Sequence, residues 1–218
     1  MAGLFNKWFS SKAKSERRLD SPSQLTTGDL VKFKLLAPSL LAGQTFKVDE
    51  VNTYHYEHSV ETEFVLRGSQ RRTLFMTVDT SEDDPTLRLS VKLTRAEVAS
   101  LFNLDQFAKI FDQEGGELII HRQHAPDEPG HPLADLQGFT APEYVRTAFA
   151  ITAYFCKGDF RERQQELDDA AGESLDYYCI TSADERHAIE SEVYDGDDDV
   201  LCTLIADTQL VEELWPAT

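Results

Sequence analysis

The sequence has few cysteines, no long apolar run and no recognisable catalytic motif. Only three cysteines, Cys156, Cys179 and Cys202, occur in 218 residues, and no two of them have CxxC spacing. A small, odd number of cysteines does not build a disulfide framework, so we expect reduced, buried thiols and a cytoplasmic protein. No apolar run approaches the ~20 residues that a membrane-spanning helix needs.

Patterns typical of enzymes are also missing. The chain contains no GxSxG, P-loop, GxGxxG or HExxH pattern. Cys179 and Cys202 lie among apolar residues of predicted strands, which is the setting of inert rather than nucleophilic thiols. We therefore expect a non-enzymatic protein without a cofactor.

Charge is distributed unevenly along the chain. Residues 1–18 sum to +4, so the rest of the chain carries −22 against −18 for the whole. After Lys157 there is no further lysine, and eighteen Asp and Glu face three arginines. This acidity disfavours nucleic acid as a partner and would attract a basic one. Solubility alone is the commoner reason for such acidity.

The N-terminal tail, residues 1–20, has the composition of an amphipathic helix. Its apolar residues recur at helical spacing among lysines and arginines, and such a helix can lie in the headgroup layer of a membrane. We expect the tail to dock on the inner membrane or on a partner, with packing on its own domain as the alternative. The residues predicted to dock are Leu4, Phe5, Lys7, Trp8, Phe9, Lys12, Lys14, Arg17 and Arg18.

Apolar alternation predicts an α+β protein built mostly of antiparallel strands. Strands are expected at 30–35, 46–51, 61–66, 73–78 and 87–93, and a capping box at Thr94 and Glu97 predicts a short helix after them. A second helix is expected over 104–113. Residues 140–155 begin like a helix, but their Tyr, Val, Thr and Ile content favours a strand.

A weak internal repeat is the basis of the predicted domain organisation. Displacing the chain by 114 residues sets 64–66 over 178–180; an acidic turn then recurs in both halves, and residues 210–215 follow it opposite 97–102. We therefore predict two similar β-rich halves, at 24–113 and 117–218, each with a hairpin that has an acidic tip and is followed by a short helix. Chance similarity of two β-rich segments is the alternative.

Two groups of side chains could bind metal ions. The acidic turns could hold calcium, but their spacing is not that of an EF-hand loop, and hairpin tips are commonly rich in Asp. The loop after residue 117 gathers His121, His124 and His131, whose imidazoles suit zinc or iron, but their spacing matches no metal motif. For both we favour a solvated surface. The acidic-turn residues are Asp79, Glu82, Asp83, Asp84, Asp195, Asp197, Asp198 and Asp199.

Four segments of the second half resemble the uncharacterised bacterial YjfK-like proteins. The resemblance implies a companion of a PspA-type membrane-remodelling protein, because members are encoded beside one and beside enzymes of the glutathionylspermidine kind. It implies a role in envelope stress or membrane maintenance, with a coiled-coil partner, and it supplies no site residues. The segments are Asp159-Phe-Arg161, Tyr177-Tyr178, Ala188-Ile-Glu-Ser-Glu-Val-Tyr-Asp-Gly196 and Val211-Glu-Glu-Leu-Trp-Pro216.

The sequence therefore supports three hypotheses of function. The first is a non-enzymatic cytoplasmic adaptor, peripheral at the inner membrane, that docks through its tail. The second is a polyamine- or metal-binding protein or enzyme, since carboxylates of the acidic half suit cations. The third is an acidic inhibitor of the immunity type that masks a basic toxin.

Overall fold

The computed structural model describes residues 17–81, 83–113, 118–126, 131, 133–167 and 172–217. As expected, the protein is mostly antiparallel β-sheet with a few short helices. The helices are η1 (Pro22–Gln24), α1 (Arg95–Leu101), α2 (Leu104–Phe107), η2 (Ala108–Phe111), η3 (Ala134–Leu136), η4 (Gln164–Glu166) and η5 (Thr208–Leu210). The strands are β1 (Leu30–Phe33), β2 (Thr45–Tyr56), β3 (Val60–Arg67), β4 (Leu74–Asp79), β5 (Thr86–Leu93), β6 (Ile119–His121), β7 (Glu143–Cys156), β8 (Glu173–Thr181), β9 (His187–Val193), β10 (Asp198–Asp207) and β11 (Val211–Trp215).

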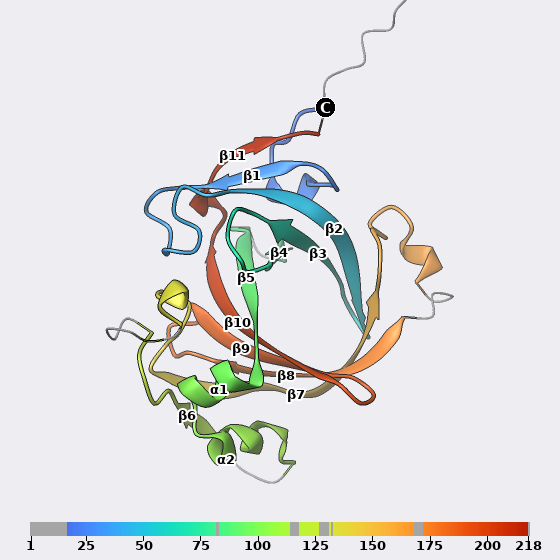
Figure 1. Cartoon of the computed structure of the whole chain (residues 1–218). Helices are drawn as coiled ribbons and strands as arrows, with labels where there is room; N and C mark the ends of the chain where they lie inside the picture. Colours follow the sequence, from blue (N-terminus) through green and yellow to red (C-terminus); the bar gives the residue numbers. More distant parts are fainter. Residues whose placement is uncertain are drawn as a thin grey trace, which may run out of the picture.

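The sheet closes on itself into an eight-stranded barrel. Its strand order is β11-β1-β2-β3-β4-β5-β10-β9-β8-β7-β6, and the ends of β2 and β7 also pair, with Thr53 opposite Cys156 and Tyr56 opposite Ala153. This pairing joins β2-β3-β4-β5-β10-β9-β8-β7 into a ring, which Figure 1 shows with α2 outside it. β1 pairs with the first half of β2, and β6 with the first half of β7, so both lie outside the closed part.

The large apolar core lies on the outer face of this barrel and covers much of it. Side chains alternate between the faces of a strand, and on β3 Phe64 and Leu66 are buried in the core while Glu63 and Val65 point the other way. Glu63 and Val65 line a cavity whose walls come from all eight strands of the ring, so their face is the inner one. Loops and helices cover the outer face, contributing Leu25, Leu41, Val98, Leu101, Leu136 and Phe139 to the core.

Helix α1 begins as the sequence predicts. The Thr94 hydroxyl accepts from the Glu97 backbone amide, and the Glu97 carboxylate accepts from the Thr94 amide, which together satisfy two free donors of the first turn. Arg72, in the β3–β4 connection, pairs with Glu97 at 2.8 Å and with Asp135 of η3. These ion pairs join α1 and the η3 loop to one end of the barrel.

Several sequence predictions are confirmed, and one is wrong. Residues 140–155 do form a strand, β7, and the three cysteines are buried and free. The helix expected over 104–113 is one turn of α-helix followed by the 3-10 turn η2. The helix expected at 210–215 is instead strand β11, because Trp215 and Leu214 pair with Leu30 and Val31 of β1.

The 114-residue displacement aligns strands of the first half with strands of the second half, but it does not align the faces on which their side chains lie. β3-β4-β5 and β8-β9-β10 are both antiparallel meanders. The displacement places Phe64 on Tyr178, both on the outer face, but it places outward Met76 on inward Glu190. Because a slip of one residue exchanges the two faces of a strand, the displacement does not hold beyond the first strand of each meander. The two-halves prediction is thus not confirmed, and both meanders are joined edge to edge through β5 and β10.

Candidate functional site

The interior of the barrel contains a cavity of about 400 Å³, here called the chamber. This volume lies within the range of ordinary small-molecule sites. Every strand of the closed ring contributes to its wall, so barrel closure creates the site. The lining residues are Glu50, Asn52, Tyr54, Glu63, Val65, Arg67, Thr73, Phe75, Lys92, Phe155, Glu173, Glu192, Tyr194, Asp197, Asp199 and Leu201.

Carboxylates outnumber cations threefold in the chamber wall. Six acids (Glu50, Glu63, Glu173, Glu192, Asp197 and Asp199) face only two cations. Both cations already have acidic partners: Lys92 pairs with Asp199, and Arg67 lies 3.4 Å from the Asp49 carboxylate. The chamber therefore has an uncompensated negative charge.

Two buried carboxylates form the inner part of the site. Glu63 is 6% exposed and accepts a hydrogen bond of 3.0 Å from the Asn52 side-chain amide. Glu192 accepts from the hydroxyls of Tyr54 at 3.1 Å and Tyr194 at 2.7 Å. Burial raises the pKa of each carboxyl to about 7, with a further contribution from the charge of other acids, including Glu192 on Glu63. Neither has an ion-pair partner among the described residues, so each lacks a compensating cation.

Asn52 has an unused acceptor at the same place. Its side-chain Nδ2 donates to Glu63, but its Oδ1 has no hydrogen-bond partner, although the residue is only 4% exposed. A buried acceptor left unsatisfied costs about 1–3 kcal/mol, so it favours a ligand that brings a donor.

Aromatic rings form much of the remaining wall. Tyr54 and Phe155 lie with ring centroids 5.3 Å apart, and Phe75 and Tyr194 also line the chamber. The faces of such rings attract cations, an interaction strengthened where water is excluded. Charge and ring faces thus favour the same kind of ligand.

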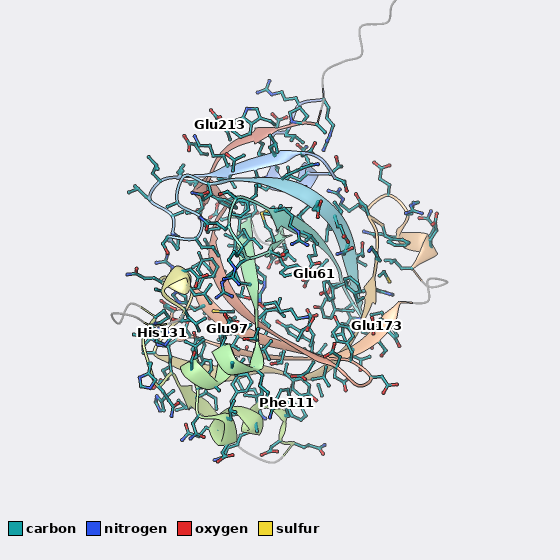
Figure 2. The ribbon with its side chains drawn as sticks, in the orientation of Figure 1. Glu61, Glu97, Phe111, His131, Glu173 and Glu213 are labelled. Atoms are coloured by element: carbon teal, nitrogen blue, oxygen red, sulfur yellow. The ribbon has the colours of Figure 1, made fainter. Side chains whose placement is uncertain are left out.

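Beyond the inner carboxylates the barrel narrows to a pocket of about 30 Å³. Arg88 pairs with Glu190 at 2.9 Å, and the Tyr177 hydroxyl donates to the same carboxylate at 2.9 Å. The Tyr56 and Tyr177 rings lie 6.2 Å apart across the interior. Figure 2 shows Glu61 within the ring of strands near this end, whereas Glu213 lies on the outer strand β11. With a volume of about 30 Å³, this pocket is too small for an alkyl chain, so it closes this end of the chamber.

The two acidic turns predicted from the sequence lie at opposite ends of the barrel. Asp197 and Asp199 of the second turn line the rim of the chamber, near Asp195 and Asp198. Asp79 ends β4, at the end of the barrel where β3 begins, and its carboxylate accepts from the Ser81 amide. Hydrogen bonds from the side chain of Ser81 and then from its backbone amide lower the pKa of Asp79. Asp83 and Asp84 are exposed in the same turn, and Glu82 lies outside the described residues.

The three histidines of the predicted metal loop are not brought to a common site in the described part of the chain. His121, on β6, lies 3.3 Å from Glu143, and His131 Nδ1 accepts from the Leu133 amide at 3.1 Å. Within the described ranges, which include His124, no group of three His, Cys, Asp or Glu side chains is arranged to hold a metal ion.

Most of the predicted docking tail lies outside the described residues. Of its members only Arg17 and Arg18 are described. Arg17 pairs at 2.8 Å with Asp29, which is fully buried, and donates to Thr26, while Arg18 is exposed beside Asp20. One basic residue of the tail is therefore used to hold the base of the tail on the barrel.

Sequence reasoning missed the inner residues of the chamber. Their signal is present as polar residues at every second position, such as Asn52 and Tyr54 on β2 or Glu190 and Glu192 on β9. In an open sheet this pattern marks the solvent face, and only closure of the sheet turns that face inward.

Fold and site together define a closed antiparallel β-barrel with an acidic, aromatic interior chamber. Comparisons with family models, curated proteins and solved structures find no match to this chain, so the resemblance to YjfK-like proteins stays a prediction. In the described ranges, no helix is both long and apolar enough to cross a bilayer.

Proposed function

We propose that this protein binds a small organic cation inside its barrel. The observation that carries the proposal is the chamber itself: unpaired buried carboxylates beside the free acceptor of Asn52, within a wall of aromatic rings. A neutral ligand would leave these carboxylates uncompensated, and an anionic ligand would be repelled. A cation with N–H groups supplies both charge and donors.

An organic cation fits the chamber better than a metal ion. The acids are distributed around the wall among tyrosines and phenylalanines, and no three metal-ligating side chains gather at one point in the described residues. A volume of about 400 Å³ also exceeds what one ion needs. This supports the polyamine-type alternative over the metal-binding one.

Calorimetric titration with n-pentylammonium, n-pentanol and pentanoate tests the proposal. These probes share a chain length and differ in charge, so we expect heat only from the ammonium. The Glu192→Gln variant should bind it at least tenfold more weakly, since Gln keeps an acceptor for Tyr54 but carries no charge. Glu213→Gln, on the exposed strand β11, is the matched control and should bind like the natural protein. Equal heats from the three probes, or none from any, would refute the proposal.

Docking of the tail is a second proposal, and it concerns a different part of the molecule. The basic composition of residues 1–18 supports contact with an anionic membrane surface or a PspA-type coiled-coil partner. The ion pair of Arg17 with buried Asp29 favours it, because it fixes where such a tail leaves the barrel. An accessory role in membrane maintenance would use the tail for contact with the membrane or partner and the chamber for binding the cation.

A further inference from the structure

We infer that the ligand of the chamber is a linear diamine or longer polyamine, with a primary ammonium at the inner carboxylates and a second cationic nitrogen at the rim. The inference rests on the proposed function and names the chemical class of its cation.

The inner site has the acceptors that a primary ammonium needs. An –NH₃⁺ group carries three N–H donors and no acceptor. Glu63 and Glu192 each offer a carboxylate, and Asn52 offers the Oδ1 that has no partner. Asn52 is 96% buried, so its oxygen lacks a partner in the interior of the protein. This is evidence for a ligand that does not depend on the acids. Three acceptors from β2, β3 and β9 match three donors, whereas a quaternary ammonium would leave the Asn52 oxygen unsatisfied.

A second group of acids lies at the rim. Glu173 and Asp197 both line the chamber, are exposed, and have no ion pair among the described residues. Glu50 joins them, although it also lies 3.4 Å from exposed Lys157. Figure 2 places Glu173 where β8 enters the ring. A monoamine bound at the inner site would leave this second group without a cation.

The distance between the two groups suits a short alkyl chain. Glu50 and Asn52 both line the chamber from β2 and are two residues apart, which corresponds to about 7 Å along a strand. A chain of about four or five methylene groups covers such a length. Val65, Phe75, Phe155 and Leu201 line the wall, giving those methylenes apolar contacts.

The closed end of the chamber sets the direction of the ligand. Arg88 and its partner Glu190 occupy the narrow pocket beyond the inner carboxylates. The remaining space there is only about 30 Å³, so the ligand extends from Glu63 and Glu192 back toward the rim. Longer polyamines then place their additional nitrogens beyond Glu173 and Asp197, in solvent.

Titration calorimetry with 1,5-diaminopentane and n-pentylamine tests the inference, because the two probes differ only in the second ammonium. We expect the diamine to bind at least tenfold more tightly. The rim variant Glu173→Gln/Asp197→Asn should weaken diamine binding about tenfold and leave monoamine binding unchanged. The inner variant Asn52→Leu should weaken both, and Glu213→Gln should alter neither.

The outcomes separate this inference from the proposed function. Equal affinity of monoamine and diamine would overturn the two-nitrogen ligand while leaving cation binding intact. Equal affinity of 1,5-diaminopentane and the N-acetyl methylamide of lysine would also overturn it, and would indicate a lysine side chain of a partner protein instead. Absence of binding by every amine would refute both proposals.

Discussion

Replacing Glu63 with Gln should stabilise the ligand-free protein, by an amount that grows as the pH rises from about 4.5 to 7 and is constant above that. Glu63 is 94% buried, and its pKa is raised from 4.5 to about 7, mainly by desolvation. Its folded-state pKa therefore lies above its unfolded value, so the folded protein takes up a proton between about pH 4.5 and 7. Stability that depends on this carboxyl is complete below pH 4.5 and is lost as the pH rises through 7.

The magnitude follows from the difference between the two pKa values. One pKa unit corresponds to about 1.4 kcal/mol, so burying the ionised Glu63 carboxylate costs about 3 kcal/mol at pH 8.5. Gln has nearly the same shape, and its Oε1 can accept the same hydrogen bond from Asn52. The variant should thus gain about 3 kcal/mol at pH 8.5 and almost nothing at pH 4.5.

Urea unfolding of the natural protein and of Glu63→Gln at the two pH values measures this difference. The gain should be smaller for Glu63→Gln/Glu192→Gln than the sum of the single gains, because the charge of Glu192 contributes to the raised pKa of Glu63. An equal gain at both pH values would refute the reasoning, since it would arise from packing rather than charge. A Glu63→Gln variant that is less stable than the natural protein at pH 8.5 would also refute the reasoning.

Three further predictions concern other parts of the molecule. Thr94→Ala removes the cap of α1 and should cost about 1 kcal/mol in urea unfolding, whereas a loss below about 0.3 kcal/mol would mean that tertiary contacts alone hold the helix. Cys202 is fully buried and its pKa is raised to about 12 by desolvation, so it should resist alkylation in native protein at pH 8 and react after unfolding. Rapid native labelling would contradict its burial. Trp8→Ser/Phe9→Ser should abolish co-sedimentation with anionic vesicles, which should also weaken as salt rises. Because Arg17 pairs with Asp29, this variant is a better test than deleting residues 1–18, and unchanged sedimentation would refute membrane docking by the tail.

Local signals in the sequence predicted local structure well. The Thr94 capping box, the strand character of residues 140–155 and the burial of the cysteines all depend on neighbours in the chain or on composition. The end of the chain was mispredicted because β11 forms through its pairing with β1, about 180 residues earlier in the chain, which local sequence does not reveal.

The chamber could not be predicted from the sequence for a related reason. Glu63 and Glu192 belong to strands far apart in the sequence, and their alternation with apolar residues fits a solvent-facing row equally well. What makes them an inner pair is the pairing of Thr53 with Cys156, which closes the sheet. Of the acidic-turn residues that the structure describes, Asp197 and Asp199 alone line the chamber, because their turn lies at its rim.

The placement of the apolar core outside the barrel assigns packing and cavity lining to different side chains. In a barrel with an apolar interior, a residue that changes ligand preference also changes the packing that keeps the protein folded. Here Phe64 and Leu66 hold the fold on one face of β3, while Glu63 and Val65 line the chamber on the other. The residues that line the chamber can therefore be substituted without disturbing the apolar packing that holds the fold. This makes the barrel a suitable scaffold for redesigned ligand specificity.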